Sequence, residues 1–289
     1  MKRLTTSLTA ALGLSCLILL GAGAPAPYST PPASAGGNKP FRWPEGKRMA
    51  ISLTFDDARL SQPDVGLPLL DRLGVKATFY VEPRNVEQRL EGWKKVVASG
   101  HEIANHSMTH PCSGNFLWSR SNALEDYTLE RIAQEMDMCN AEIERLLGVK
   151  ATNFAYPCGQ KFVGRGRGVK SYVPVAAERF LTARGYLEET GNDPAYFDFA
   201  QATGTGFDDM DFPAMKKLVE QAAEEGRWII FAGHEIGKKS FQVTDTAALE
   251  ELCEYAKDPA NGIWIDTVEN IGRYIQRQRG ETPGRAAGE

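Results

Sequence analysis

Hydrophobic residues beyond Phe41 occur in two kinds of segment: short apolar runs, and longer stretches in which apolar positions recur with a helical period. The short runs are typical of buried strands, and the longer amphipathic stretches are typical of helices. We predict strands at Met49–Phe55, Ala77–Val81, Glu102–Asn105, Thr152–Tyr156, Trp228–Ala232 and Ile263–Asp266. We predict helices at Val65–Leu73, Val86–Ser99, Leu124–Leu147, Val173–Arg184, Phe212–Glu225, Thr246–Ala256 and Val268–Arg277.

The order of these elements indicates the fold class. Strands alternate with helices, which favours an α/β fold with a parallel sheet, either a barrel or a doubly wound sheet. Gly100 and Gly148 directly follow predicted helices, as C-terminal glycines commonly do. No Gly-x-Gly-x-x-Gly segment follows the first strand, so the sequence does not support a dinucleotide-binding site.

The first residues have the pattern of a secretory signal peptide. Lys2 and Arg3 precede an apolar segment at Leu8–Leu20, and the Ala-Ser-Ala triplet at 33–35 offers a cleavage site. The apolar segment is shorter than the about 20 residues that a membrane span needs. We therefore expect an exported protein, secreted or periplasmic, without a membrane span in the mature chain. An uncleaved anchor is the alternative.

Composition and charge narrow the class of protein. With 42% hydrophobic and 24% charged residues, the 289-residue chain is typical of globular proteins. Its 33 basic and 37 acidic residues give a net charge of -4, and the scattered basic residues do not favour a nucleic-acid partner. The expected organisation is a signal peptide at 1–35, a linker at 36–47, a catalytic domain at 48–278 and a flexible tail at 279–289.

Side chains that can bind metals or transfer protons follow several predicted strands. Asp56 and Asp57 follow the first strand, His106 and His110 follow the third, and His234 follows the strand at 228–232. Active sites of parallel barrels form at this end of the strands. Two histidines four residues apart can face one point on a helical turn. One Asp and two His form a ligand set for a divalent metal, which leaves one Asp and one His as base and acid.

Each of these features also has a simpler interpretation when it is considered alone. Asp56 and Asp57 could form a solvated turn, and His106 and His110 could be surface histidines. The fourth histidine, His101, is expected to be structural. Their combination at the strand ends is what favours an active site.

These residues resemble the polysaccharide deacetylases, carbohydrate esterase family 4, which share the NodB homology domain. Thr54–Asp57 is similar to the first motif of that family, and His106–His110 to its second motif. Ala232–His234 stands where the last motif would be, and the resemblance covers about residues 48–275. It implies a distorted (β/α) barrel, usually of seven strands, with the active site at the C-terminal ends of the strands.

The resemblance also implies a hydrolase that removes acetyl groups from a polysaccharide, of the N-acetylglucosamine type or the acetylated xylan type. Asp57, His106 and His110 would bind the metal, most simply Zn²⁺, with Co²⁺, Ni²⁺ or Mn²⁺ as alternatives. Asp56 would be the general base and His234 the general acid. The alternatives are a non-catalytic glycan-binding module on the same fold and a metal-dependent hydrolase of non-glycan amides.

The third and fourth motifs depart from the family pattern. The third motif usually reads Arg-x-Pro-Tyr/Phe, but Ala155–Cys158 lacks the arginine that orients the catalytic aspartate. Arg165 or Arg167 could replace it from the glycine-rich segment. The backbone amide of Cys158 is the expected oxyanion donor. The aspartate that supports His234 could be any of Asp198, Asp208 and Asp209.

The cysteines and aromatic residues near the second motif complete the candidate site. Cys112 and Cys158 each directly follow a proline beside the candidate site, and we predict a disulfide between them. The alternative is that Cys158 is a metal ligand or a nucleophile. Cys139 and Cys253 are expected to be buried thiols. Three aromatic residues could form either a sugar-binding platform or a packed loop: Phe116, Trp118 and Tyr127.

Overall fold

A computed structural model describes residues 41–281 of the chain. The predicted signal peptide at 1–35, residues 36–40 of the linker and residues 282–289 of the tail lie outside the described residues. Among the described residues, no helix combines the length and the apolar character that a membrane span requires.

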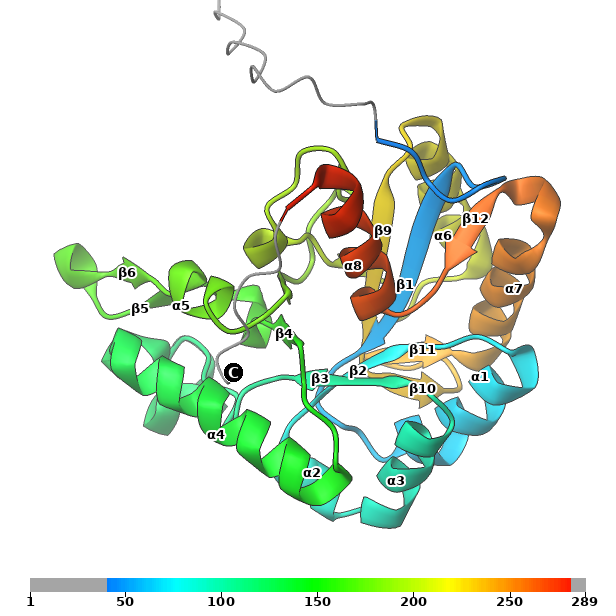
Figure 1. The fold of residues 1–289 in the computed structure, drawn as a ribbon. Coiled ribbons are helices and arrows are strands. Elements are labelled where there is room, and N and C mark those ends of the chain that lie inside the picture. The colour runs from blue at the N-terminus through cyan, green and yellow to red at the C-terminus, as the bar shows by residue number, and fades with distance from the viewer. Residues whose placement is uncertain (1–40, 282–289) are drawn as a thin grey trace, which may run out of the picture. The chain divides into compact units, whose positions relative to one another are not determined.

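A parallel sheet forms the centre of the fold (Figure 1). Seven strands follow one another in the order β7-β4-β3-β2-β1-β9-β8, and β12 pairs with the first half of β1. The strands are β1 (Met49–Phe55), β2 (Thr78–Val81), β3 (Glu102–Asn105), β4 (Asn153–Ala155), β7 (Thr182–Arg184), β8 (Thr205–Gly206), β9 (Trp228–Gly233) and β12 (Ile263–Ile265).

The sheet curls so that its two edge regions approach each other. β8 pairs with β9 at one edge, and the segment just before β8 forms a parallel bridge to β7 between Ala202 and Arg184. The strands of this barrel are short and unequal, which makes it irregular. The expected distorted (β/α) barrel is confirmed.

Helices surround the sheet and pack on it through their apolar faces (Figure 1). In α4, the residues Ile132, Met136, Cys139 and Ile143 recur at helical spacing and are fully buried. The helices are α1 (Leu67–Leu73), α2 (Pro83–Glu87), α3 (Leu90–Ala98), α4 (Leu129–Leu147), α5 (Val173–Ala177), α6 (Phe212–Glu224), α7 (Thr246–Lys257) and α8 (Val268–Arg279).

One predicted helix is wrong over half its length. The segment predicted as a helix at Val173–Arg184 forms the short helix α5 and then the strand β7. Asn153 of β4 accepts hydrogen bonds from the backbone N and the hydroxyl of Thr182, so pairing with β4 overrides the helical pattern. Within the main sheet, β7 and β8 are the two strands that the hydrophobic pattern missed.

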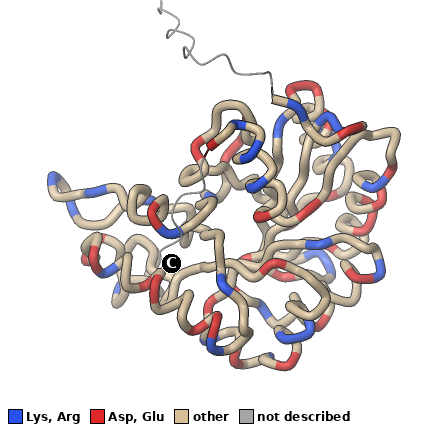
Figure 2. The backbone as a smooth tube through the Cα atoms, viewed as in Figure 1, with Lys and Arg blue, Asp and Glu red and all other residues tan. Residues whose placement is uncertain are grey.

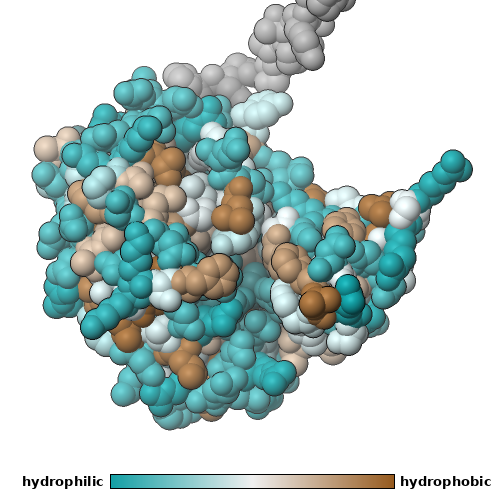
Figure 3. Space-filling model, turned by 180° about the vertical axis from the view of Figure 1, so that it is seen from behind, coloured by the Kyte–Doolittle hydropathy of each residue, from teal (hydrophilic) through white to brown (hydrophobic). Residues whose placement is uncertain are grey.

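Two small sheets lie outside the barrel. β5 (Phe162–Val163) and β6 (Lys170–Ser171) form an antiparallel hairpin that carries the glycine-rich segment, and β10 (Glu235–Gly237) pairs with β11 (Val243–Asp245). Lys and Arg are interspersed with Asp and Glu around the outer elements (Figure 2). The face opposite to that of Figure 1 is mostly hydrophilic with separate hydrophobic groups (Figure 3).

Candidate active site

The predicted site residues meet at the carboxyl ends of the barrel strands. Asp56 and Asp57 follow β1, His106 follows β3, Cys158 lies in the turn after β4, and His234 follows β9. Because β1 pairs with β9 on one side and with β2 on the other, and β2 pairs with β3, these ends are neighbours. All five residues are buried or partly buried.

Asp57, His106 and His110 form a group that could hold a metal ion. The Nε2 atoms of His106 and His110 each lie 3.4 Å from Asp57 Oδ1, and the ligand atoms of the group are within 4.8 Å of one another. Asp57 Oδ1 is buried and has no hydrogen-bond partner. A buried carboxylate oxygen is costly unless a partner satisfies it, so this atom fits a bound cation.

The hydrogen bonds of the two histidines leave the correct nitrogens free for a metal. His106 Nδ1 donates to the backbone O of Ala155 at 2.9 Å, and His110 Nδ1 approaches Cys112 Sγ at 3.7 Å. In its neutral form, each ring therefore directs the lone pair of Nε2 toward Asp57. Such outer partners commonly fix the tautomer of metal-binding histidines.

The charges of the group also fit a cation. Burial opposes ionisation of Asp57, but the surrounding histidines hold its pKa well below its usual range. Burial, together with the nearby His106, lowers the pKa of His110 to about 4, which keeps this ring neutral at pH 7. Burial also opposes the charge on His106, yet the two neighbouring carboxylates raise its pKa. The ionised Asp57 favours a cation in this group, and the donor set of one carboxylate and two imidazoles fits a divalent metal ion.

The segment that carries the two histidines is a loop, not the expected helical turn. Ser107 and His110 have left-handed backbones with φ of 66° and 50°, and the two imidazole rings lie 4.8 Å apart. Asn105 accepts a hydrogen bond from the Ser107 amide, and the Ser107 hydroxyl accepts one from the His110 amide. These side-chain bonds stabilise the loop in place of helical backbone bonds.

The arginine that is absent from the third motif is supplied by the next strand. Arg184 of β7 is fully buried and donates a hydrogen bond through Nη2 to Asp56 Oδ1. In the parallel register of β4 and β7, Arg184 lies directly opposite Ala155, the position where the family pattern has its arginine. The guanidinium also lies 4.7 Å from the ring centroid of Tyr80.

The two arginines proposed from the sequence do not fill this role. Arg165 pairs with the exposed Asp126 at 2.7 Å, and Arg167 is exposed at the tip of the β5–β6 hairpin. Their position on a solvent-exposed hairpin explains the error, because it keeps both side chains away from Asp56. No strand was predicted between residues 156 and 228. That long gap was the signal that a further strand, which could carry the arginine, had been missed.

Among the three candidate aspartates, Asp208 is the one that contacts His234. Its Oδ2 accepts from His234 Nδ1 at 2.6 Å, and its Oδ1 accepts from the Thr244 hydroxyl at 2.9 Å. His234 Nε2 is left facing the metal-binding group, 4.0 Å from Asp57 Oδ2. Asp198 instead caps a short 3-10 helix at Phe199–Gln201, and Asp209 is exposed.

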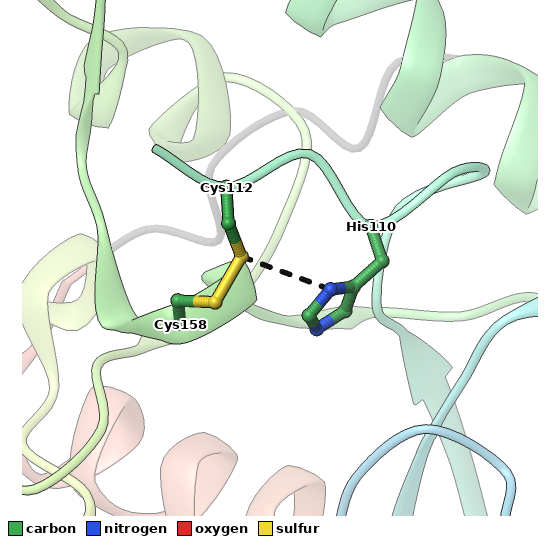
Figure 4. Close-up of side chains that lie close together, drawn as sticks. All are labelled: His110, Cys112 and Cys158. Atoms are coloured by element: carbon green, nitrogen blue, oxygen red, sulfur yellow. Dashed lines mark hydrogen bonds between the residues drawn. A yellow bond between two sulfur atoms is a disulfide. The ribbon is translucent and has the colours of Figure 1, made fainter. Parts of the chain in front are cut away.

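Cys112 and Cys158 are joined by a disulfide beside the metal-binding group (Figure 4). This is the predicted pairing, and it links the loop after His110 to the turn after β4. Neither sulfur can act as a thiolate ligand or nucleophile while the bond is intact. Cys139 and Cys253 are free and buried, as expected.

The three aromatic residues after the second motif divide into two groups. Phe116 and Trp118 stack with ring centroids 5.4 Å apart and are 42% and 61% exposed, and Trp118 lies 5.8 Å from the ring of His110. Tyr127 is buried, and its hydroxyl bonds to polar side chains beneath the loop. Only the first two are therefore available as a surface platform.

Several residues at the site carried no recognisable sequence signal. Gln62 is fully buried, and its Nε2 donates to the backbone O of Asp56 at 2.6 Å and to that of His234 at 2.9 Å. Arg59 Nη2 donates to Asp57 Oδ2 at 2.8 Å, so Oδ1 remains as the oxygen that faces the histidines. The Gln62–His234 contact joins residues 172 apart, and the Arg59–Asp57 contact depends on the conformation of the turn after β1, so neither follows from residue spacing.

The backbone of the site is unusual. Among the described residues, eight that are not glycine have positive φ, and five of these belong to the site: Asp57, Ala58, Ser107, His110 and Cys158. Such conformations cost free energy and tend to occur where function requires them. Their concentration here supports the assignment of this rim as the functional site.

Comparison with known proteins shows what part of the chain is similar to. Residues 44–165 match the sequence profile of the polysaccharide deacetylases. Over this segment, the chain resembles the polysaccharide deacetylases. Its barrel has the same fold as a Mycobacterium smegmatis protein described as a polysaccharide deacetylase, with a TM-score of 0.61 and 18% identity over 84% of this chain and 95% of that one.

Two curated deacetylases share shorter segments with this polysaccharide deacetylase-like chain. A chitooligosaccharide deacetylase of a Bradyrhizobium species is 45% identical over 64 residues, which are 22% of this chain and 29% of that protein. A peptidoglycan-N-acetylglucosamine deacetylase of Bacillus cereus is 36% identical over 90 residues, 26% of this chain and 31% of that protein. The matched region thus spans less than a third of the length of either relative.

Proposed function

We propose that the chain is a metal-dependent deacetylase that hydrolyses acetyl groups on a polysaccharide of the N-acetylglucosamine type. The observation that carries the proposal is the juxtaposition of three units: the metal-binding group, the Asp56–Arg184 pair and the His234–Asp208 pair. The names of the two curated relatives support an N-acetylated glycan.

Asp56 is the proposed general base. Its buried ion pair with Arg184 keeps the carboxylate oriented and balances its charge. The free side of the carboxylate accepts the proton of the attacking water. A divalent ion, most simply Zn²⁺, held by Asp57, His106 and His110 would supply Lewis-acid activation of the water and the acetyl carbonyl.

His234 is the proposed general acid. Asp208 accepts a hydrogen bond from Nδ1, which stabilises the protonated ring and directs the Nε2 proton toward the reaction centre. This proton would pass to the nitrogen of the leaving sugar amine. The backbone amide of Cys158, in a left-handed residue at φ 55°, would donate to the oxyanion that develops on the acetyl oxygen.

The surface beside the site is suited to a sugar chain. The stacked rings of Phe116 and Trp118 are exposed and adjoin His110. Aromatic faces pack against the apolar faces of sugar rings, and they are costly to expose without a ligand. We propose that this aromatic pair binds a sugar residue next to the one that is deacetylated.

The proposed location is outside the cytoplasm, secreted or periplasmic, after removal of the segment at 1–35. The Cys112–Cys158 disulfide supports this location, because disulfides persist in oxidising compartments. Cell-wall or environmental polysaccharides are then the accessible substrates.

The direct test is acetate release by the purified protein from chitin oligosaccharides, peptidoglycan and acetylated xylan, with and without added Zn²⁺. The proposal expects metal-dependent release from an N-acetylated substrate and none by the Asp56→Asn variant. Release from acetylated xylan alone would change the substrate class to an ester. Glycan binding without acetate release by the metal-loaded protein would contradict the proposal and favour a binding module.

A further inference from the structure

We propose that the Cys112–Cys158 disulfide determines which of two metal-ligand sets includes His110. With the disulfide intact, His110 completes the set with Asp57 and His106. After reduction, His110 joins Cys112 and Cys158 in a second set that binds a thiophilic divalent ion such as Zn²⁺ or Co²⁺. The inference rests on the proposed metal site and extends it.

The two ligand sets share one imidazole and face opposite nitrogens of its ring. His110 Nε2 lies 3.4 Å from Asp57 Oδ1, whereas Nδ1 lies 3.7 Å from Cys112 Sγ (Figure 4). The potential ligand atoms of His110, Cys112 and Cys158 are all within 4.8 Å of one another, the same span as in the first set. Small side-chain movements can bring such atoms to metal-bonding distances.

The two sets exclude each other because a neutral imidazole has only one nitrogen with a free lone pair. Binding with Asp57 and His106 uses the Nε2 lone pair, which places the proton on Nδ1, the nitrogen 3.7 Å from Cys112 Sγ. For Nδ1 to bind a metal, the proton must move to Nε2. His110 is then unable to complete the set with Asp57 and His106.

Reduction supplies the missing thiolates. Two electrons and two protons from a dithiol or phosphine reductant convert the disulfide into two thiols, and these thiols lose their protons as they bind the metal. Thiolates are soft ligands that bind Zn²⁺ and Co²⁺ well, and two of them with one histidine form a set that leaves a fourth position for water. Cys158 is only partly buried, which gives a reductant access to the bond.

Cobalt spectroscopy tests this inference. Co²⁺ is added to the oxidised protein and to protein reduced with a phosphine, which contributes no thiol of its own. We expect ligand-field bands in both forms, but a thiolate-to-cobalt charge-transfer band only after reduction. The band should be lost in the Cys112→Ser and Cys158→Ser variants. It should persist in the matched controls Cys139→Ser and Cys253→Ser, because those thiols are buried in the core.

The outcomes separate this inference from the proposed function. Failure of the oxidised protein to bind Co²⁺ would overturn the proposed metal site itself. Co²⁺ binding by both forms, with no charge-transfer band after reduction, would overturn only the exchange of ligands. If the serine variants do not fold, alkylation of the reduced wild-type protein with iodoacetamide before cobalt addition provides the same comparison, and a band that survives alkylation contradicts the inference.

Discussion

The metal-binding group and the pairs at Asp56 and His234 differ in how far they could be predicted from the sequence. Asp57, His106 and His110 come from two short motifs, and both motifs are visible in the sequence. The partners of Asp56 and His234 are Arg184, 128 residues away, and Asp208, 26 residues away. The proposed metal ligands thus follow local patterns, whereas the partners that orient Asp56 and His234 depend on how the barrel closes.

The largest effect is expected from the metal-binding group. Replacement of His106 by Ala should reduce acetate release to the background rate, because a two-residue set holds a divalent ion weakly. Metal content of the purified variant and isothermal titration with Zn²⁺ measure the binding directly. Chelation of the wild-type protein should have the same effect, and activity should return when Zn²⁺ is added back. Activity that survives chelation would contradict the assignment.

Next in size is the effect of Arg184. The Arg184→Ala variant leaves the carboxylate of Asp56 buried without its partner, and loss of one member of a buried pair costs about 3–5 kcal/mol. We expect a lower free energy of unfolding in urea and a large loss of kcat. Arg165→Ala is the matched control, since its exposed pair with Asp126 contributes little.

The same pair allows a transplantation test. Because Ala155 and Arg184 face each other in the register of β4 and β7, an arginine at position 155 should reach Asp56 when Arg184 is absent. The double variant Ala155→Arg, Arg184→Ala should recover part of the lost kcat and of the lost stability. A folded double variant with no more activity than Arg184→Ala would show that the two positions are not equivalent.

A smaller loss is expected for the support of His234. In the Asp208→Asn variant the ring loses the carboxylate that stabilises its protonated form, and kcat should fall by no more than the about 10²–10⁴-fold that a general acid contributes. Metal affinity should be unchanged, which distinguishes this variant from His106→Ala. Asp209→Asn is the control, because Asp209 is exposed and asparagine tolerates its positive φ.

The smallest effect should come from the aromatic pair. Removal of the exposed Trp118 ring by the Trp118→Ala change should raise KM for a chitin oligosaccharide about 2-fold to 10-fold, equivalent to about 0.5–1.5 kcal/mol. The value of kcat and the melting temperature should stay close to those of the wild type. Tyr196→Ala, at an 85% exposed position, is the control for loss of a surface aromatic ring. A Trp118→Ala variant with wild-type KM on glycans of all lengths would argue against the platform.

The sequence predicted the parts of the fold that rely on local periodicity. The strand at Met49–Phe55 is long and wholly buried, and it was recognisable. The helix predicted at Leu124–Leu147 was recognisable from its helical period, although it begins at Leu129. The strands β7 and β8 contain three and two residues. So few residues cannot establish a period, and their pairing with neighbours determines their conformation. Arg184 was missed for this reason rather than through an error in the chemistry.

The same distinction between local and long-range information applies to the candidate site. The pairing of Cys112 with Cys158 could be predicted, because both cysteines adjoin motifs that were already expected to meet. The conformation of the His106–His110 loop was not, since left-handed residues without glycine are set by hydrogen bonds such as that from the Ser107 amide to Asn105. Spacing alone therefore identified the ligands but not the geometry that brings them together.

Gln62 has a consequence for the rigidity of the candidate site. One side-chain amide bonds to the carbonyls of both Asp56 and His234, at the ends of two strands that pair over six residues. The separation between Asp56 and His234, the proposed base and acid, is therefore held both by the pairing of β1 with β9 and by this shared amide. Under the proposed function, the scissile bond would have to fit a gap of fixed width, and the loops around it would have to distinguish long glycans from short ones.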